Sequence, residues 1–429
     1  MKVSKWTVGL AGAGLVTLPA LVQAEEKPSA IMTALSSTTI SGYVDTSAQW
    51  DIGTGNAFVP GFVYNAGKQD GFNLNKVKVR IERPLDEAQW AAGYKVDLLF
   101  GPDANTFGTS SLGTIAATSD FAIQQAYVAL RAPVGNGLDL KLGVFDSIIG
   151  YESHDSVNNP NYTRSYGTTI EPHTHTGLLA TYQAADWIGI AAGIANTFGP
   201  TINQRANPPK AESYKTYMAS VALTAPESMS FLKGSTIYAG VINGFNSGTQ
   251  PSTATPGLTV GGQQTSWYVG ATVATPITAL KVGASYDYAR AGSVLDTTAG
   301  PPGTPLGSTH QEAAAIYASL QATEKLSLHA RGEYFWQSGT LASRLAAGQA
   351  ANLAAGIIST PIPVLPSKVF AATGTVQYDL WKNVLSRLEV RWDHAANGSD
   401  AYGGDPGAVT PAPGKKNAVL VAANIVYKF

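Results

Sequence analysis

The sequence predicts an all-β protein, a single transmembrane antiparallel β-barrel of about sixteen strands. Three observations support this fold class. Segments of about ten residues alternate between charged and apolar side chains, and the connections between them are short and long in turn. After the N-terminal region, no apolar stretch reaches the roughly 18 residues of a membrane helix. Because only helices and closed barrels satisfy every backbone group in lipid, such a chain enters a membrane as a barrel.

The composition fits a protein whose outer surface does not all face water. Of the 429 residues, 13% are charged and 44% are hydrophobic, and there are 45 glycines. The chain contains no cysteine. An exported protein without disulfides must be held together in another way, and the closed hydrogen-bonded ladder of a barrel can do this.

The N-terminus has the features of a secretory signal. Lys2 and Lys5 precede an apolar stretch at 6–21, and Val22-Gln23-Ala24 offers the small residues of a cleavage site. A retained membrane anchor is the alternative interpretation. Without the two lysines of this region, 26 basic residues remain against 29 acidic ones, a net charge of about −3, which argues against nucleic acid as a partner. The expected division of the chain is a signal peptide at 1–24, a short periplasmic N-terminal segment at 25–37 and the barrel at 38–429.

Alternation with a period of two is clearest in three segments. In "KVKVRIER" the charged residues from Lys76 to Glu82 share one face, and the apolar residues between them share the other. The segment 387–393 repeats the pattern, and so does "HARGEYFW" at 329–336. Each is close to the length of a tilted transmembrane strand, about nine to eleven residues. The sixteen expected strands are 38–50, 72–84, 89–100, 121–132, 137–145, 174–183, 187–197, 214–225, 234–245, 265–275, 280–290, 311–322, 326–336, 369–380, 384–393 and 418–429.

The connections fall into two kinds that alternate along the chain. Short ones include "PLDEA" at 84–88, "PVGNG" at 133–137 and "ATEK" at 322–325. Outer-membrane barrels have short periplasmic turns and long external loops, and an even number of strands places both ends of the barrel on the periplasmic side. Residues 341–358 are a candidate for a short helix within their loop. The expected long connections are 51–71, 101–120, 146–173, 198–213, 246–264, 291–310, 337–368 and 394–417.

The last expected strand, "NAVLVAANIVYKF", alternates and ends at Phe429. Val419, Val421, Ile425 and Tyr427 share the face of this terminal aromatic residue. Such an ending resembles the C-terminal signal by which the outer-membrane assembly machinery recognises barrels. We therefore expect this machinery to be a partner of the chain.

Placing the apolar strand faces toward lipid puts the charged faces in the lumen, since a charge on the lipid side costs a few kcal/mol near the midplane. In "HARGEYFW", Ala330, Gly332 and Tyr334 then face lipid or a neighbouring subunit. The alternative is that the inward charges are solvated wall residues held in ion pairs. The expected pore-lining basic residues are Lys76, Lys78, Arg80, Lys95, Arg131, Lys141, Arg331, Arg387 and Arg391, and the expected acidic ones are Asp97, Glu333 and Glu389. Glu82, Asp139, Lys281, Asp287 and His329 fall on the same faces.

A barrel of sixteen strands is wide enough for an aqueous channel and is usually narrowed from inside. The third long connection, residues 146–173, is the natural candidate for this constriction. If it folds inward, its acids would face the basic residues of the first strands and set a transverse field that filters solutes by charge. An external flap is the alternative. The expected constriction residues are Asp146, Glu152, Asp155, Arg164 and Glu171.

Catalytic and metal sites find little support in the sequence. His173 and His175 are two residues apart, with His154 upstream, but no carboxylate stands at a fixed spacing to complete a metal site. No serine is singled out beside a histidine, as a hydrolase would require. We expect no enzyme, no cofactor and no bound metal.

Four stretches carry a family resemblance: "SGYVDTSAQWD" (41–51), "LDEAQWAAGYKVDLLFGPDA" (85–104), "QQAYVALRAPVGNGLDLKLGVFDSIIGYE" (124–152) and "NNPNYTRSYGTTIEPHTHTGLLATY" (158–182). They resemble the β-barrel porin-2, OmpL-like, family of bacterial outer-membrane proteins. The more specific motifs are Gly150-Tyr151-Glu152, Asn159-Pro160-x-Tyr162-x-Arg164-Ser165 and His175-Thr176-Gly177. The resemblance implies a single barrel and a pore, and it draws attention to 146–173, but it says little about the solute.

These observations together predict an outer-membrane porin of a Gram-negative bacterium, a passive diffusion channel for small hydrophilic solutes. The solute gradient would drive transport, and pore radius and lumen charge would set selectivity. A substrate-specific uptake channel, for example for sugars that stack on Tyr127 and Phe145, is the first alternative. A non-conducting structural barrel or adhesin is the second. The expected partners are outer-membrane lipid, the solutes and, by analogy with other barrels of this size, two further copies in a homotrimer.

Overall fold

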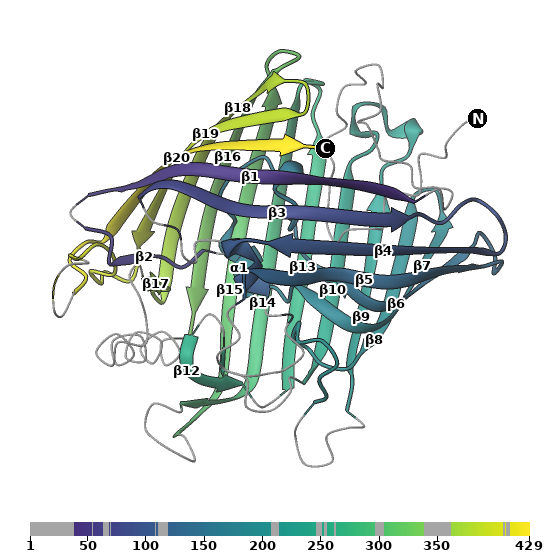
Figure 1. Ribbon diagram of the computed structural model, residues 1–429, viewed down its shortest axis with the longest axis horizontal. Helices are drawn as coiled ribbons and strands as arrows, with labels where there is room; N and C mark the ends of the chain where they lie inside the picture. The colour runs from purple at the N-terminus through teal and green to yellow at the C-terminus, as the bar shows by residue number, and fades with distance from the viewer. Residues whose placement is uncertain are drawn as a thin grey trace.

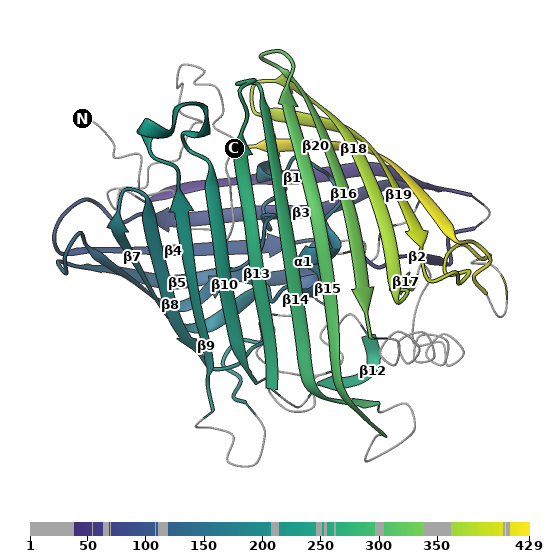
Figure 2. The same ribbon diagram turned by 180° about the vertical axis from the view of Figure 1, so that it is seen from behind.

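Sixteen strands form one closed antiparallel β-barrel in the computed structural model (Figures 1 and 2). The fold class predicted from the sequence is confirmed. The structure describes residues 38–53, 55–62, 68, 70–107, 109, 119–206, 214–245, 251–252, 255–260, 263–296, 304–338, 362–405, 408 and 412–429. The expected signal peptide, the segment 25–37 and the candidate helix at 341–358 lie outside these residues.

Each barrel strand pairs with its neighbours in the chain, and pairing of the first strand with the last closes the barrel. In this seam Val44 lies opposite Tyr427, and Trp50 lies opposite Val421. The strands are β1 (Thr39–Ile52), β3 (Gly71–Arg83), β4 (Ala91–Phe100), β5 (Phe121–Ala132), β6 (Leu138–Asp146), β7 (Thr174–Ala185), β8 (Ile188–Ala195), β9 (Thr216–Thr224), β10 (Thr236–Phe245), β13 (Gln263–Ala274), β14 (Leu280–Asp296), β15 (Thr304–Gln321), β16 (Leu326–Gln337), β18 (Lys368–Trp381), β19 (Val384–Ala395) and β20 (Asn417–Lys428).

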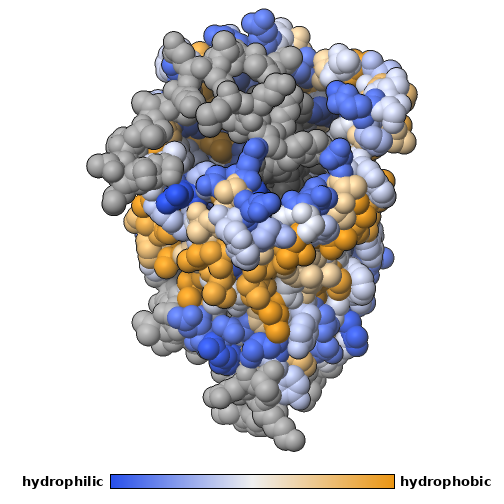
Figure 3. Space-filling model, turned by 90° about the vertical axis from the view of Figure 1, so that its right-hand side faces the viewer, coloured by the Kyte–Doolittle hydropathy of each residue, from blue (hydrophilic) through white to orange (hydrophobic). Residues whose placement is uncertain are grey.

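The alternation of the sequence decides which side chains face inward. In β16, Arg331 and Glu333 are buried inside the barrel. Leu328, which lies between the buried residues Ser327 and His329, points out. Outward apolar residues such as Ile316 and Leu388 are more than half exposed on the outer wall. Figure 3 shows hydrophobic residues gathered in a band across this wall, with hydrophilic residues on both sides of it. A band of this kind is what a lipid bilayer requires of a barrel surface.

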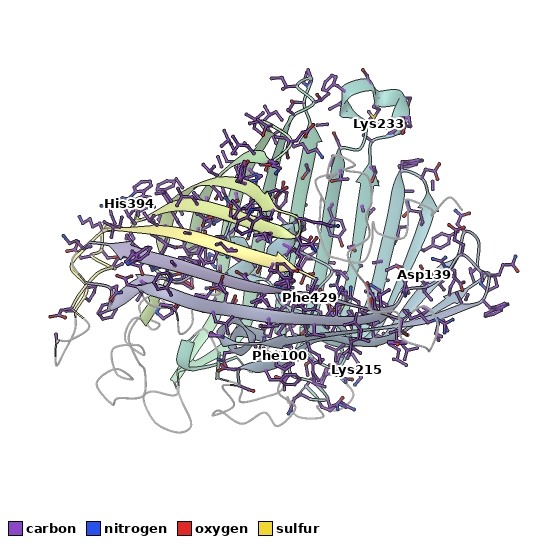
Figure 4. All side chains as sticks on the ribbon, turned by 45° about the horizontal axis from the view of Figure 1, so that its top comes forward. Phe100, Asp139, Lys215, Lys233, His394 and Phe429 are labelled. Carbon is purple, nitrogen blue, oxygen red and sulfur yellow. The ribbon has the colours of Figure 1, made fainter. Side chains whose placement is uncertain are left out.

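The short connections lie at one end of the barrel and the long ones at the other. In the turn "PVGNG", which joins β5 to β6, Gly135 and Gly137 have positive φ angles of 57° and 106°, which glycine adopts without a steric penalty. Figure 4 places Asp139 and Lys233 toward the end with the short turns, and His394 toward the opposite end. The first and last barrel strands also begin and end at the short-turn side.

Several long connections contain strands that the sequence did not predict. The expected connection 291–310 is wrong in extent, because β14 continues to Asp296 and β15 already begins at Thr304. Within 246–264 lie β11 (Pro251–Ser252) and β12 (Thr255–Val260), and β12 pairs with the extension of β14. Within 51–71 and 337–368 lie β2 (Phe58–Pro60) and β17 (Ile362–Val364), which pair in parallel. These pairings join residues far apart in sequence, so local periodicity cannot reveal them.

Helical segments are short. They are η1 (Pro102–Phe107), η2 (Ser156–Asn158), α1 (Tyr166–Ile170) and η4 (Glu227–Leu232). Ser165 caps α1, since its side chain accepts a hydrogen bond from the backbone N–H of Thr168. Within the described ranges no helix has the length and apolar character to cross a membrane.

Candidate functional site

The connection 146–173, called the inner segment below, lies inside the barrel. Figure 1 shows its helix α1 surrounded by strands. Ser147 N–H donates to the carbonyl of His173 at 2.8 Å, so the two ends of the segment are held together where they leave β6 and enter β7. Between these ends the segment contacts wall residues on several sides of the interior. The alternative interpretation of this segment as an external flap is therefore wrong.

An apolar cluster fixes the first residues of the inner segment. Ile148 and Ile149 are buried against side chains from β6 to β13, and the hydroxyl of Tyr238 donates to the carbonyl of Ile148. Phe145 points inward but is only 1% exposed in this cluster, so it offers no face to a passing solute. The buried members of the cluster are Phe145, Ile148, Ile149, Leu179, Ala191, Ala195, Phe198, Met218, Ile242 and Tyr268.

The wall formed by β3 to β5 holds the middle of the inner segment through ion pairs. Asp155 contacts Lys78 directly, and its Oδ2 atom lies 3.1 Å from Nη2 of Arg80. Nζ of Lys76 donates to the carbonyl of His154 at 2.8 Å. Burial alone would raise the pKa of Asp155, but Lys78 and Arg80 hold this pKa well below its usual range. Asp155 therefore lies in direct contact with the basic residues of β3.

Asp97 joins the same group of charges from β4. Its carboxylate accepts from Nε and Nη2 of Arg80 at 2.8 and 2.9 Å, and Nζ of Lys78 lies 2.9 Å away. Two β-bulges bring additional amides to this wall. The register between β1 and β3 shifts at Asp45, so Asn75 and Lys76 both point inward, and a similar shift between β4 and β5 turns Gln124 inward. Neither bulge has a local signal in the sequence.

A second wall, formed by β16 to β19, holds the second half of the inner segment through buried arginines. Nη1 of Arg331 lies 2.8 Å from Oε1 of Glu152 and 2.9 Å from the carbonyl of Thr163. The guanidinium of Arg331 also pairs with Glu333 at 2.6 Å. Nη1 of Arg391 donates to the carbonyl of Arg164 at 2.6 Å. Because both partners of these charge pairs are buried, removing one would leave a charge without compensation.

Carboxylates of the same wall accept hydrogen bonds from the backbone of the inner segment. Glu389 accepts from the N–H groups of Tyr162 at 2.6 Å and Thr163 at 2.9 Å. Glu333 accepts from the N–H of Tyr166 at 2.7 Å. Arg387 donates to the carbonyls of Ser156 and Asn159 at 2.8 and 2.5 Å. The inner segment is thus attached to two walls, β3 to β5 and β16 to β19, which β20 and β1 separate in the closed sheet. Since its ends lie at β6 and β7, across the barrel from β16 and β18 in the strand order, the segment crosses the interior.

Other residues expected to line the pore or its constriction make contacts along the wall. Lys95 lies 3.7 Å from Glu82, and Arg131 pairs with Asp139 at 2.6 Å close to the short turn between β5 and β6. Nζ of Lys141 lies 5.1 Å from the ring centroid of Tyr127. Asp146 is the last residue of β6, where its carboxylate accepts from Gln124 at 3.1 Å.

The remaining two charges of the inner segment differ in their surroundings. Arg164 is 2% exposed, and its Nη1 donates to the carbonyl of Tyr162 at 3.1 Å. Glu171 is hydrogen-bonded to Asp287 of β14, and burial together with this second carboxyl raises the pKa of Glu171 well above its usual range. A Cβ atom on Gly167 would lie only 2.4 Å from Oδ2 of Asp287, so the close approach of α1 to this carboxyl requires glycine.

The three histidines considered for a metal site do not converge. The rings of His154 and His173 meet edge to face, with centroids 5.0 Å apart, beside Phe107. His175 packs instead against Phe145 and Phe198. Burial and the neighbouring His173 lower the pKa of His154 well below its usual value. In the described part of the chain, no three metal-ligating side chains form a group.

Two contacts at the end with the long connections were missed in the sequence. Lys68 and Asp103 form a buried ion pair of 2.8 Å, and Nζ of Lys68 lies 5.4 Å from the ring centroid of Tyr162. The ring of Phe62 lies over the guanidinium of Arg391 at 4.3 Å. Lys68 thus joins the first long connection to the second one and to the inner segment, and Phe62 joins it to the wall behind. None of these contacts has a local signal in the sequence.

A family model described as "putative beta-barrel porin-2, OmpL-like" matches residues 37–429, nearly the whole chain. The chain belongs to this family. The match confirms the resemblance expected from the motifs of the first six strands. Taken with the closed barrel, membership of the family makes the chain an outer-membrane porin, a channel protein.

Solved structures similar to this porin are themselves outer-membrane proteins. The outer membrane protein OmpT of Vibrio cholerae is 12% identical with a TM-score of 0.53, and the alignment covers 94% of this chain and 100% of OmpT. The outer membrane channel DcaP of Acinetobacter baumannii is 13% identical with a TM-score of 0.53, covering 93% and 99%. An anion-selective porin from Comamonas acidovorans is 11% identical with a TM-score of 0.53, covering 92% and 99%. At these identities the similarity is one of fold alone. No curated protein matches the chain.

The interior of this porin also contains a hollow on one side of the inner segment. It has a volume of about 50 Å³, is partly open, and lies between residues 151–160 and the strands β13 to β15. The hollow is lined by Tyr151, Glu152, Asn158, Asn159, Pro160, Thr272, Lys281, Val282, Gly283, Tyr317 and Ser319.

Proposed function

We propose that this porin is a passive diffusion channel for small hydrophilic solutes and that the inner segment narrows its pore. The attachment of this segment to two separate walls supports the proposal: Asp155 pairs with Lys78 of β3, and Glu152 pairs with Arg331 of β16. A segment that crosses the interior and is held by buried ion pairs reduces the open cross-section of a wide barrel. It does so as a fixed part of the pore, not as a hinged gate. The gradient of the solute supplies the driving force, so no catalytic group is required.

Selectivity in this proposal comes from the charges that stay partly accessible beside the inner segment. Arg80 keeps 24% of its side chain exposed and Lys95 keeps 12%, whereas Arg331 and Arg391 are fully covered. We infer that the first pair acts on passing ions and that the second pair acts as an anchor. Charged groups in a narrow, low-dielectric passage act on ions more strongly than they do in bulk water.

The conductance of single channels in planar bilayers tests the proposed function. The intact protein should give stepwise currents, and replacing residues 152–166 by a short Gly-Ser linker should raise the size of each step, because the crossing element is gone. Removing residues 200–205 from an external connection is the matched control and should leave the step unchanged. Far-ultraviolet circular dichroism checks that each variant keeps its strands. Equal conductance of the linker variant and the intact protein would contradict narrowing by this segment, and no current from the intact protein would contradict a channel.

The assembly and export of the chain form a second part of the proposal. We infer cleavage after Ala24, insertion by the outer-membrane assembly machinery through the strand that ends at Phe429, and association into a homotrimer. Phe429 exchanges backbone hydrogen bonds with Gly42 of β1, so the proposed signal lies in the closing seam. Among similar folds, a structure of OmpT is described as its trimer form. Native mass spectrometry of protein purified from outer membranes should give three times the mass of a chain that starts at Glu25. A single chain, or retention of residues 1–24, would contradict the corresponding step.

A further inference from the structure

The hollow beside the inner segment has a volume of about 50 Å³ and is partly open. It is lined by residues 151–160 and by β13 to β15. Thr272, Lys281 and Ser319 lie near the ends of their strands that adjoin the short turns. A solute that has entered the barrel from that side meets this hollow before it meets the far side of the inner segment.

Lys281 is the cation of the hollow. It is half-buried and lies on the inward face of β14, the face that also carries Gly283 and Asp287. Within the described ranges no carboxylate lies at ion-pair distance from its ammonium group, and no hydrogen bond occupies it. A lysine held in this way, partly removed from water and without a counter-charge, favours an anion at its side.

The one carboxylate that lines the hollow does not oppose an anion. Oε1 of Glu152 is occupied by Nη1 of Arg331 at 2.8 Å. Its Oε2 accepts from the N–H of Ser165 at 2.8 Å and from the hydroxyl of Thr168 at 3.1 Å. The negative charge of Glu152 is therefore compensated within the wall and the inner segment, which leaves Lys281 as the uncompensated charge of the lining.

Neutral polar groups of the hollow suit hydroxyl groups of a ligand. The side chain of Asn158 is exposed at the end of η2. Oγ of Ser319 lies 2.9 Å from Nδ1 of His329, its cross-strand neighbour in β16, so the hydroxyl has a fixed partner behind it. An amide and a hydroxyl can each donate or accept, as a polyhydroxylated molecule requires.

A pair of tyrosines closes one side of the hollow. The rings of Tyr151 and Tyr317 are stacked, with centroids 4.0 Å apart and planes inclined by 16°. The hydroxyl of Tyr151 lies 2.9 Å from Oγ1 of Thr272. A Cβ atom on Gly283 would lie 1.8 Å from that hydroxyl, so the absence of a side chain at this position lets Tyr151 reach the wall. The shape of the hollow thus depends on contacts between the inner segment and β13 to β15.

We propose that this hollow is a binding subsite for a small hydroxylated carboxylate. The carboxylate group binds the ammonium of Lys281, and the hydroxyl groups bind Asn158 and Ser319. The proposal deepens the channel function proposed above and rests on it, because the subsite lies on the route of a solute through the barrel. It assigns a substrate class that neither the fold nor the family supplies.

Block of single-channel current by gluconate tests the subsite. Gluconate carries one carboxylate and five hydroxyl groups, and glucose is its uncharged counterpart. With the intact protein, gluconate on the short-turn side should reduce the current in a concentration-dependent way, and glucose at equal concentration should do so far less. Lys281→Met should raise the half-blocking concentration of gluconate about tenfold, the loss expected for one charge-assisted hydrogen bond. Lys281→Arg should retain the block.

Substitutions of two further lysines distinguish block at a local site from block by a diffuse positive potential. Lys141 also points into the barrel but lies on β6, away from the hollow, and Lys325 is exposed in the turn before β16. Lys141→Met and Lys325→Met should both keep the gluconate block of the intact protein. Stepwise current without gluconate block, or equal loss of block in Lys141→Met and Lys281→Met, would overturn the subsite while leaving the channel in place. Absence of current would overturn the channel and the subsite that rests on it.

Discussion

Two carboxyl groups of the inner segment are stabilised in different ways. Asp155 keeps its charge because Lys78 and Arg80 contact it. Glu171 has a second carboxyl, Asp287, as its hydrogen-bond partner, and burial together with that partner raises the pKa of Glu171 well above its usual range. Two buried carboxyls in contact are stable when they share a proton, since ionising both would place two negative charges side by side.

This difference predicts how the attachment of the inner segment depends on pH. The folded-state pKa of Glu171 lies above its ordinary value of 4.5. Its contribution to stability is therefore fully present below that ordinary value and is lost as pH rises through the raised pKa. Glu171→Gln cannot ionise and should keep the contact with Asp287. The midpoint of thermal unfolding of this variant, relative to the intact protein, should be higher at pH 9 than at pH 5.

Circular dichroism in detergent at the two pH values measures this shift. Glu324→Gln, in the exposed turn before β16, is the matched control because it removes the same charge at a site without carboxyl neighbours in contact. Its effect should be the same at both pH values. A Glu171→Gln variant whose effect is also independent of pH would show that the two carboxyls do not share a proton.

At the scale of single strands, the sequence was sufficient to assign the faces. Every second residue is ionisable from His329 to Glu333 in β16 and from Arg387 to Asp393 in β19. The inward position of Arg331 and Arg391 follows from this period of two alone. A one-residue error would have placed each of these charges on the outer wall. The charge pattern therefore carries enough information to orient a strand without knowledge of its neighbours.

Bulges and loop strands could not be predicted in this way. Asn75 and Lys76 are consecutive, yet both point inward, because β3 has one more residue than β1 at this position. The β2 and β17 pair joins segments about 300 residues apart in the chain. Such features depend on which backbone groups meet in three dimensions, and a single sequence read for local periodicity does not contain that information.

The contacts of the inner segment could be predicted from the sequence only in part. Its charges marked it as a candidate, and Glu152 and Asp155 do pair with wall cations. Its partners among the strands, such as Glu389 for the backbone of Tyr162 and Thr163, were not predictable, since backbone N–H groups leave no trace in the sequence. The apolar anchor at Ile148 and Ile149 was missed as well, because their partners lie on strands far away in the sequence.

At the scale of the whole molecule, the barrel keeps its charges inside and an apolar band outside, the reverse of a soluble protein. Gly374 allows this arrangement to be tested at one position. It lies in the middle of β18 on the outward face, opposite Ala330 of β16 and Val390 of β19. A Cβ atom added to Gly374 would have no heavy atom within 4 Å, so a side chain can be introduced there without a steric clash.

Gly374→Arg should destabilise the barrel in lipid vesicles by about 2–4 kcal/mol relative to Gly374→Ala, the cost of an arginine on the lipid face near the bilayer midplane. Urea unfolding in vesicles, followed by tryptophan fluorescence, measures the difference.

Thr373→Arg, one residue along the strand on the inward face, serves as a comparison. This side chain enters the crowded region around Arg331, whose Nη2 donates to the hydroxyl of Thr373 at 3.2 Å. That variant should lose stability through repulsion and overpacking whether the barrel is in vesicles or in detergent micelles. The cost of Gly374→Arg should instead fall in micelles, where a long side chain reaches water more easily. Equal stability of Gly374→Arg and Gly374→Ala in vesicles would mean that this face does not meet the hydrocarbon core.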